Sequence, residues 1–311
     1  MIIFQYLKLI RVKNLALLAI MQLVIRYGFL SHQTEYLALS HFQYLLLVLA
    51  TLLIAAAGYV INDIFDQETN LINKPEKVIV GKHISESAAY NYYVALNIIG
   101  VCIGFYLSNV IEKPSFSTLF ILIAASLYFY ATNLKHIILI GNVLVAIQLA
   151  LSVLIIGVFD LFPATYNGNQ EQMSILFGIL LDYALFVFII SLIREIIKDV
   201  EGNKGDYNQG YKTLPIVLGI KRTIKLVFGL SIIPFLLVLY YCYNYLMENQ
   251  LYYAVFYVIF LVLAPMLYFT INCWNSKTKK DFTHLSSILK LILFFGVTSI
   301  AAISYNIKLN A

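Results

Sequence analysis

The chain has 311 residues, of which 61% are hydrophobic and only 12% are charged. An ordinary soluble domain has about 25% charged residues, so this composition excludes a typical water-soluble protein and indicates a protein that resides among membrane lipids. The net charge of +5 comes from an excess of Lys and Arg. Because these residues gather on one side of the apolar runs, the charge is a topology signal. It supports no nucleic-acid partner, and the sequence implies no obligate protein partner.

Apolar runs long enough to cross a hydrocarbon core of about 30 Å as helices recur along the whole sequence. Strands of a membrane barrel alternate polar and apolar residues over roughly 10 positions, whereas these runs are apolar all round, so helices are favoured. The predicted fold is an all-α polytopic bundle of about nine transmembrane helices. The expected spans are 12–31, 43–61, 88–109, 117–134, 137–159, 174–193, 224–246, 250–272 and 285–306.

The chain shows no internal boundary. Lys8 and Arg11 lie near the start of the first span and no small-residue cleavage site follows, so we expect the first helix to be retained. No Pro-rich or Ser-rich linker divides residues 1–311, which we therefore treat as a single domain. The three cysteines have no CxxC spacing, and a structural role is expected for Cys102, Cys242 and Cys273.

The Lys and Arg residues predict the orientation. If the N-terminus is cytoplasmic, nearly all of them fall on the cytoplasmic side, and the other side keeps only Lys113 and Lys308 outside the spans. This is the positive-inside bias of membrane proteins. We expect a multi-pass protein of the cell membrane whose N-terminus and acidic stretches face the cytoplasm.

The first acidic stretch, NDIFDQETNLINKPEKV at 62–78, follows an apolar run directly. If the helix continues past Ile61, then Asn62, Asp66 and Asn70 lie four residues apart on one face. Asp63 lies on an adjoining stripe. Carboxylate and amide oxygens at this spacing suit Mg²⁺, which bridges readily to substrate phosphates. Taken alone, the stretch is equally compatible with a solvated helix end.

The second stretch, REIIKDVEGNKGDYNQGYKTLP at 194–215, mixes charges of both signs, and Gly202, Gly205 and Gly210 are expected to loosen its backbone. A metal site alone needs carboxylates, and a positive-inside flank needs only Lys and Arg. A Mg²⁺–diphosphate site needs both. Two such patches on one face could hold a diphosphate between them, so here a functional interpretation is favoured.

The two stretches resemble the paired signature of the UbiA superfamily of intramembrane prenyltransferases. The likeness extends to RVKN at 11–14, to YFYATNLKHIILIGN at 128–142 and to the number of helices, and so covers nearly the whole chain. The second stretch is most similar to the geranylgeranylglycerol-phosphate geranylgeranyltransferase branch. This resemblance implies Mg²⁺-dependent transfer of a prenyl group from a prenyl diphosphate to a lipophilic acceptor. The favoured acceptor is a geranylgeranylglyceryl phosphate-type hydroxyl.

The family motifs can be carried over residue by residue. The motif NxxxDxxxD falls on Asn62, Asp66 and Asn70, and the motif DxxxD falls on Gly202 and Asp206. Asn70 and Gly202 depart from the pattern, and each removes a formal charge that would attract a dication. Neighbouring carboxylates that could compensate are Asp63, Glu68 and Asp199.

The resemblance implies roles for three overlapping groups of residues. The expected metal ligands are Asn62, Asp66, Asp199 and Asp206, and the expected catalytic carboxylates are Asp66, Asp206, Asp199 and Asp63. Substrate binding is expected from Arg11, Asn14, Lys77, Lys135, Arg194, Lys198 and Lys212. Lys135 is notable because its span otherwise lacks charge, although a positive-inside flank would also explain it. Tyr128 and Tyr130 are candidates for shielding an allylic cation. Asp182 and Gln148 match no motif.

Four other interpretations remain open. The acceptor could be an aromatic ring of the 4-hydroxybenzoate or naphthoate type. A transporter would suit nine helices and a hinted repeat, but the charges lie at span ends and no pair of Gly/Pro-broken helices marks a midplane site. A CDP-alcohol phosphotransferase is disfavoured because its DGxxAR pattern is absent. A non-catalytic scaffold would accommodate the departures at Asn70 and Gly202, and Mg²⁺-dependent activity would distinguish an enzyme from it.

Overall fold

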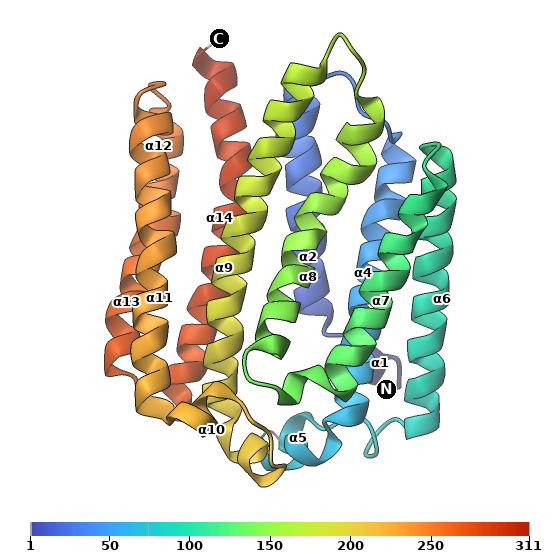
Figure 1. Cartoon of the computed structure of the whole chain (residues 1–311), viewed down its shortest axis with the longest axis vertical. Helices are drawn as coiled ribbons and strands as arrows, with labels where there is room; N and C mark the ends of the chain where they lie inside the picture. The colour runs from blue at the N-terminus through green and yellow to red at the C-terminus, as the bar shows by residue number, and fades with distance from the viewer. Residues whose placement is uncertain (1, 74, 311) are drawn as a thin grey trace.

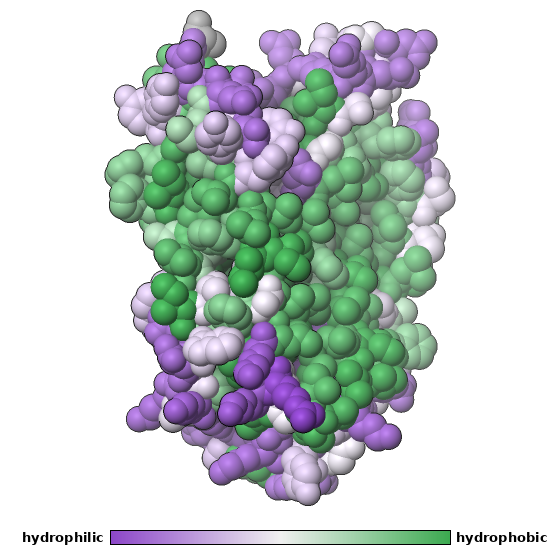
Figure 2. Space-filling model, turned by 60° about the vertical axis from the view of Figure 1, so that its left-hand side comes forward, coloured by the Kyte–Doolittle hydropathy of each residue, from purple (hydrophilic) through white to green (hydrophobic). Residues whose placement is uncertain are grey.

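The computed structural model describes residues 2–73 and 75–310, and within these ranges the chain is an all-helical bundle (Figure 1). Nine helices in this part of the chain are long and apolar enough to cross a membrane, and no β-strand forms there. The predicted fold class and number of spans are therefore confirmed. The chain is a multi-pass membrane protein, and Figure 2 shows a broad hydrophobic belt between two polar ends.

The spanning helices are built from one to three consecutive segments, with η marking 3₁₀ or π turns. In chain order they are α2 (Val12–Ile25) with η1 (Arg26–Leu30) and α3 (Ser31–Gln33); α4 (His41–Phe65); α6 (Glu86–Val110); η3 (Pro114–Phe116) with α7 (Ser117–Thr132); α8 (Ile140–Ile156) with η5 (Gly157–Leu161) and η6 (Phe162–Ala164); α9 (Gln170–Asn208); α11 (Ile220–Tyr241) with η7 (Cys242–Met247); α12 (Tyr252–Val258) with η8 (Ile259–Leu263) and α13 (Ala264–Asn275); and α14 (Lys279–Asn310).

Five short helices connect or precede these spans: α1 (Ile2–Leu9), α5 (Gln67–Asn73), η2 (Pro75–Lys77), η4 (Leu134–His136) and α10 (Leu214–Leu218). The helices α5 and α10 lie across one end of the bundle, near α1 (Figure 1). We call this the motif end, because both acidic stretches lie there. The C-terminus lies at the opposite end (Figure 1).

The helix α9 is much longer than the predicted span 174–193. It continues to Asn208, so the second acidic stretch is helical over most of its length. Hydropathy falls at Arg194, but helical hydrogen bonding needs no apolar side chains and no proline interrupts the segment before Pro215. The expectation that Gly202 and Gly205 loosen the backbone is therefore wrong. Of the three glycines in this stretch, Gly210 alone has the left-handed conformation that glycine permits, with a φ of 69° beyond the helix end.

In the described part of the chain, apolar side chains fill the space between the helices in three clusters, of which two are large. Tyr44, Phe120 and Phe159 are fully buried in the cluster that joins α4, α7 and α8 to the first half of α9. Phe269 and Cys273 belong to the second cluster, between α9 and the helices that follow it. This second cluster also holds Cys242, which agrees with a packing role for both buried thiols.

Candidate functional site

The two motif segments meet at the motif end, where α5 packs against the last turns of α9 (Figure 1). The contact is made by Asn73, the last residue of α5. Its Nδ2 donates to the Gly202 carbonyl at 2.9 Å, and its Oδ1 accepts from the Gly205 amide at 3.0 Å. The stretches that the sequence places about 130 residues apart are thus joined directly, as the predicted diphosphate site requires.

Asp66 lies at the junction of α4 and α5 and contacts two predicted site residues. Its carboxylate is 2.6 Å from the Lys135 ammonium and accepts a 2.6 Å hydrogen bond from Asn62 Nδ2. The Asn62–Asp66 contact follows from their spacing of four residues on a helix. The Lys135 side chain is only 8% exposed. Lys135 therefore points inward to a carboxylate, unlike a residue of a solvated flank.

The two other carboxylates predicted to bind the metal, Asp199 and Asp206, both lie on α9. Asp199 accepts a 2.7 Å hydrogen bond from Asn142 Nδ2, at the start of α8. Asp206 follows Gly202 by about one helical turn. A Cβ added at Gly202 would lie 3.7 Å from both carboxylate oxygens of Asp206. Within the described ranges no cation or donor pairs with the Asp206 side chain. Its charge is close enough to that of Asp66 for the two carboxylates to repel each other.

Two other acidic residues of the stretches, Asp63 and Glu195, form ion pairs with arginine and lysine side chains. Arg11 forms a 2.8 Å ion pair with Asp63 and lies over the Tyr59 ring, 4.8 Å from its centroid. On α9, Glu195 pairs with Lys198 at 2.7 Å and with Arg194 at 3.3 Å. The mixed charges of the second stretch thus form a network.

A cavity of about 200 Å³ opens beside this network and runs between the helices. The residues that line its polar mouth are Arg11, Asn14, Tyr59, Asn62, Arg194, Glu195 and Lys198. Deeper in the bundle its walls are mainly apolar and include Ile54, Leu127 and Phe120. Such a shape fits a ligand with a charged head and a long hydrocarbon tail.

The donor set suits a magnesium ion, although the site is not a preformed metal cage. Among the described residues, no three histidine, cysteine or carboxylate side chains converge as a metal-binding group. Two observations nevertheless favour a cation here. The Asn62 Oδ1 atom is buried without a hydrogen-bond partner beside Asp66. The unpaired Asp206 carboxylate faces the same region. Oxygen ligands of this kind, completed by water and phosphate oxygens, are those that Mg²⁺ prefers.

His136 and Tyr211 cover one side of the site with neutral rings, whose centroids are 3.9 Å apart. Burial and, second, the charge of Lys135 lower the pKa of His136 below its ordinary value of 6.5. Burial also raises the pKa of the Tyr211 hydroxyl, which accepts a hydrogen bond from Thr69 at 3.5 Å. Neither ring therefore adds charge to the site at neutral pH.

Some predicted residues do not join the cluster. Lys212 is exposed; its backbone amide donates to the His136 carbonyl at 3.1 Å, and its side chain forms no hydrogen bond or ion pair with the described residues. The Asn70 side chain makes no hydrogen bond in the described part of the chain, since α5 turns across the bundle after Asp66 (Figure 1). Tyr128 is 40% exposed and packs against Phe65, away from the cavity, whereas Tyr130 lines it. The side chain of Lys77 lies outside the described part of the structure.

Four residues of the site were not assigned from sequence. Asn73 and Glu195 lie inside the two stretches but carry no motif position. Tyr59 and Lys290 lie in spans, and Lys290 Nζ donates to Asn14 Oδ1 at 2.8 Å. A lysine eleven residues into the last spanning helix is itself a signal, because a charged residue within a span usually faces a partner or a cavity.

Comparisons with known proteins agree with this geometry. The sequence profile of the UbiA prenyltransferase family matches residues 24–295. The chain is 36% identical over 204 residues to the digeranylgeranylglyceryl phosphate synthase of Methanobrevibacter smithii, which covers 64% of this chain and 68% of that protein. It is also 36% identical over 221 residues to the synthase of the same name from Saccharolobus solfataricus, covering 70% of each.

Solved structures show the same fold. A digeranylgeranylglyceryl phosphate synthase structure is 24% identical, covers 99% of both chains and superimposes with a TM-score of 0.61. A UbiA homologue from Archaeoglobus fulgidus, bound to GPP and Mg²⁺, is 19% identical, covers 95% of this chain and 99% of its own, and has a TM-score of 0.59. At these identities the likeness concerns the fold alone. Taken with the family profile, it shows that the chain belongs to the UbiA prenyltransferase family.

Proposed function

We propose that this prenyltransferase moves a prenyl group from a prenyl diphosphate to the hydroxyl of a geranylgeranylglyceryl phosphate-type acceptor, with Mg²⁺ and at the cytoplasmic face. The names of its relatives support the acceptor, and the distribution of Lys and Arg supports the orientation. The observation that carries the proposal is the cavity, whose mouth is lined by Arg11, Arg194 and Lys198 next to the motif residue Asn62 and whose deeper walls are mainly apolar.

The prenyl donor binds with its tail in this cavity. Each buried methylene contributes roughly 0.8 kcal/mol, so a long isoprenoid gains several kcal/mol from the apolar walls. The diphosphate stays at the motif end between α5 and α9. Arg11, Arg194 and Lys198 reach it from the cavity mouth, and Lys135 reaches it from η4 beside Asp66.

Four residues would hold the metal: Asn62, Asp66, Asp199 and Asp206. When bound, Mg²⁺ neutralises the charge that develops on the leaving diphosphate. Asp63 has a supporting role, because its carboxylate holds the guanidinium of Arg11 at 2.8 Å and so orients it toward the cavity mouth.

Transfer breaks the allylic C–O bond, and its electron pair leaves with the diphosphate oxygen. Cationic side chains at the mouth stabilise that charge as it forms. The acceptor hydroxyl oxygen then bonds to the allylic carbon and becomes strongly acidic. A weak base is sufficient to remove its proton, and the ion-paired Glu195 carboxylate at the cavity mouth fills this role. Lys290, held beside the cavity by Asn14, is available to the acceptor phosphate.

A transfer assay on the purified protein tests the proposal. Geranylgeranyl diphosphate is supplied as donor, with and without Mg²⁺, and geranylgeranylglyceryl phosphate and 4-hydroxybenzoate are offered separately. We expect a Mg²⁺-dependent ether product with the first acceptor. A product with 4-hydroxybenzoate alone would move the protein to aromatic substrates, and equal transfer without Mg²⁺ would contradict the metal assignment.

A further inference from the structure

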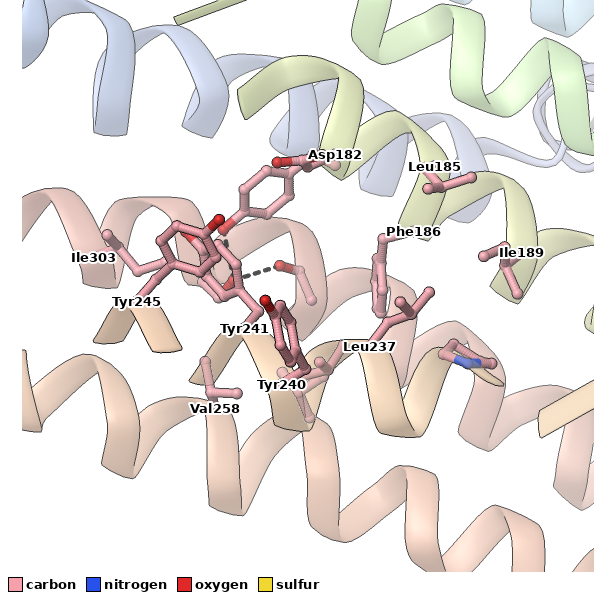
Figure 3. Close-up of a pocket in the computed structure, with 16 residues that line it drawn as sticks. Asp182, Leu185, Phe186, Ile189, Leu237, Tyr240, Tyr241, Tyr245, Val258 and Ile303 are labelled. Carbon is pink, nitrogen blue, oxygen red and sulfur yellow. Dashed lines mark hydrogen bonds between the residues drawn. The ribbon is translucent and has the colours of Figure 1, made fainter. Parts of the chain in front are cut away.

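A second cavity, of about 290 Å³, lies between α9, α11, α12 and α14, apart from the site described above. It shares no lining residue with the first cavity. Figure 3 shows Asp182 and three tyrosines at one end of it and Leu185, Phe186, Ile189 and Leu237 at the other. Because α9 runs from the opposite end of the bundle to the motif end, the polar part lies farther from the motif end than Ile189 does.

The polar end combines one carboxylate with several aromatic rings. Asp182 is an exposed residue in the middle of the apolar part of α9, and no salt bridge or hydrogen bond satisfies its side chain within residues 2–73 and 75–310. No lysine, arginine or histidine occurs among the described residues that line the cavity. A carboxylate inside a membrane span is unfavourable unless a cation or a proton accompanies it. Among the described residues, the Asp182 carboxylate therefore lacks the positively charged partner that would stabilise it in this cavity.

The tyrosines around Asp182 suit a cation. Tyr240, Tyr241 and Tyr245 line the same end, and the rings of Tyr241 and Tyr245 stack with centroids 5.1 Å apart. Tyr183 is held by a 2.9 Å hydrogen bond between its hydroxyl and that of Ser299. Tyrosine ring faces attract ammonium groups, most strongly where water is excluded. The Asp182 carboxylate would repel an anionic head group.

The backbone around the cavity departs from regular helix at three places. Pro234, which lines the cavity, lies inside α11 and removes a helical hydrogen bond. The π-helical turns η7 and η8 contribute Tyr245 and Val262 to its walls. Such π turns occur often at functional sites. On α14, a Cβ at Gly296 would lie 2.2 Å from the Phe186 ring. A larger residue at this position would therefore displace the ring from the wall of the cavity.

We propose that this cavity binds a membrane lipid with an ammonium head group, its head at Asp182 and the tyrosines and one hydrocarbon tail along Phe186, Ile189 and Leu237. The unpaired charge of Asp182 favours a positively charged head group. Along α9 the lining changes from polar at Asp182 to apolar at Ile189, which favours a ligand with a hydrocarbon tail, a lipid. The exposure of Leu237 (48%) and Tyr240 (62%) leaves the cavity open toward the surrounding lipids.

Native mass spectrometry of the delipidated protein in neutral detergent tests this site without any activity readout. The probes are dioleoyl phosphatidylethanolamine and dioleoyl phosphatidylglycerol, which have the same tails. The wild-type protein is expected to bind the ethanolamine lipid about tenfold or more tightly than the glycerol lipid. Asp182→Asn should remove this preference and Asp182→Glu should keep it. Glu248→Gln, which removes an exposed carboxylate outside the cavity, should have no effect.

Leu237→Trp supplies a second test, because it fills the apolar end from an exposed position and leaves Asp182 unchanged. It should weaken binding of the ethanolamine lipid. The proposal is wrong if the wild-type protein does not discriminate between the two lipids, if folded Asp182→Asn retains the preference, or if Leu237→Trp binds the ethanolamine lipid as the wild type does.

Discussion

The side chain of Asn73 fastens the first motif segment to the second by donating a 2.9 Å hydrogen bond to the Gly202 carbonyl. The same side chain accepts from the Gly205 amide, and Lys279 Nζ donates to the Asn73 carbonyl at 2.5 Å. A Cβ on Gly205 would lie 2.3 Å from Asn73 Nδ2, so the contact needs glycine there. Two other parts of the chain, α9 and the start of α14, thus fix the position of α5 over the site.

Asn73→Ala should weaken substrate binding more than it weakens the fold. It removes two hydrogen bonds, each contributing about 1 kcal/mol, and releases α5 from α9. We expect the KM for the prenyl diphosphate to rise by about tenfold or more, with a small change in the unfolding temperature. Asn70→Ala is the matched control, because the Asn70 side chain makes no hydrogen bond in the described part of the chain. Equal effects of the two substitutions would contradict a clamping role for Asn73.

Gly202→Asp should tighten the apparent affinity for Mg²⁺. A Cβ at this position would lie 3.7 Å from the Asp206 carboxylate and 3.3 Å from Asn73 Nδ2, so the new carboxylate would stand beside Asp206 with only a small adjustment. Without metal the two charges repel, and a dication relieves the repulsion. The measurement is the Mg²⁺ dependence of transfer, with Gly202→Asn as the uncharged control. An unchanged Mg²⁺ requirement would mean that this face of α9 does not meet the metal.

Lys135→Met should reduce transfer by about 100-fold or more and destabilise the fold by roughly 1–3 kcal/mol, since Asp66 loses a charged partner in a mostly buried pair. Lys13→Met removes the same charge from an exposed position near the same end and should change neither quantity. Kinetics and chemical denaturation measure the two effects. If both variants behave alike, Lys135 serves only as a positively charged flank.

The contribution of His136 to stability should be lost as the pH falls below about 6.5, because the pKa of His136 is lowered in the folded state, first by burial. The unfolded chain then binds the proton more readily than the folded chain, so acid favours unfolding. His136→Gln should flatten this part of the curve of unfolding temperature against pH. His83→Gln, at an exposed position, should leave the curve unchanged. A curve that is identical in wild type and His136→Gln would exclude this contribution.

The sequence predicts those features that depend on local spacing. The nine spans follow from the length of the apolar runs, and the Asn62–Asp66 contact follows from a spacing of four residues. The length of α9 is missed because its last turns are polar. Contacts such as Asn142–Asp199 and Asn14–Lys290 depend on how distant helices pack, which no local pattern records. Asn73 is missed for the same reason, because its partners belong to another helix.

The most direct test of the central claim is the binding of geranylgeranyl diphosphate to the purified protein across a Mg²⁺ titration. The wild-type protein should bind the diphosphate only weakly without Mg²⁺ and tightly with it. Asp66→Ala and Asp206→Ala should each remove this Mg²⁺ dependence while remaining folded. Glu76→Gln, an exposed carboxylate on η2, should retain it. Undiminished Mg²⁺-dependent binding in both alanine variants would contradict the assignment of the two motif carboxylates to the metal.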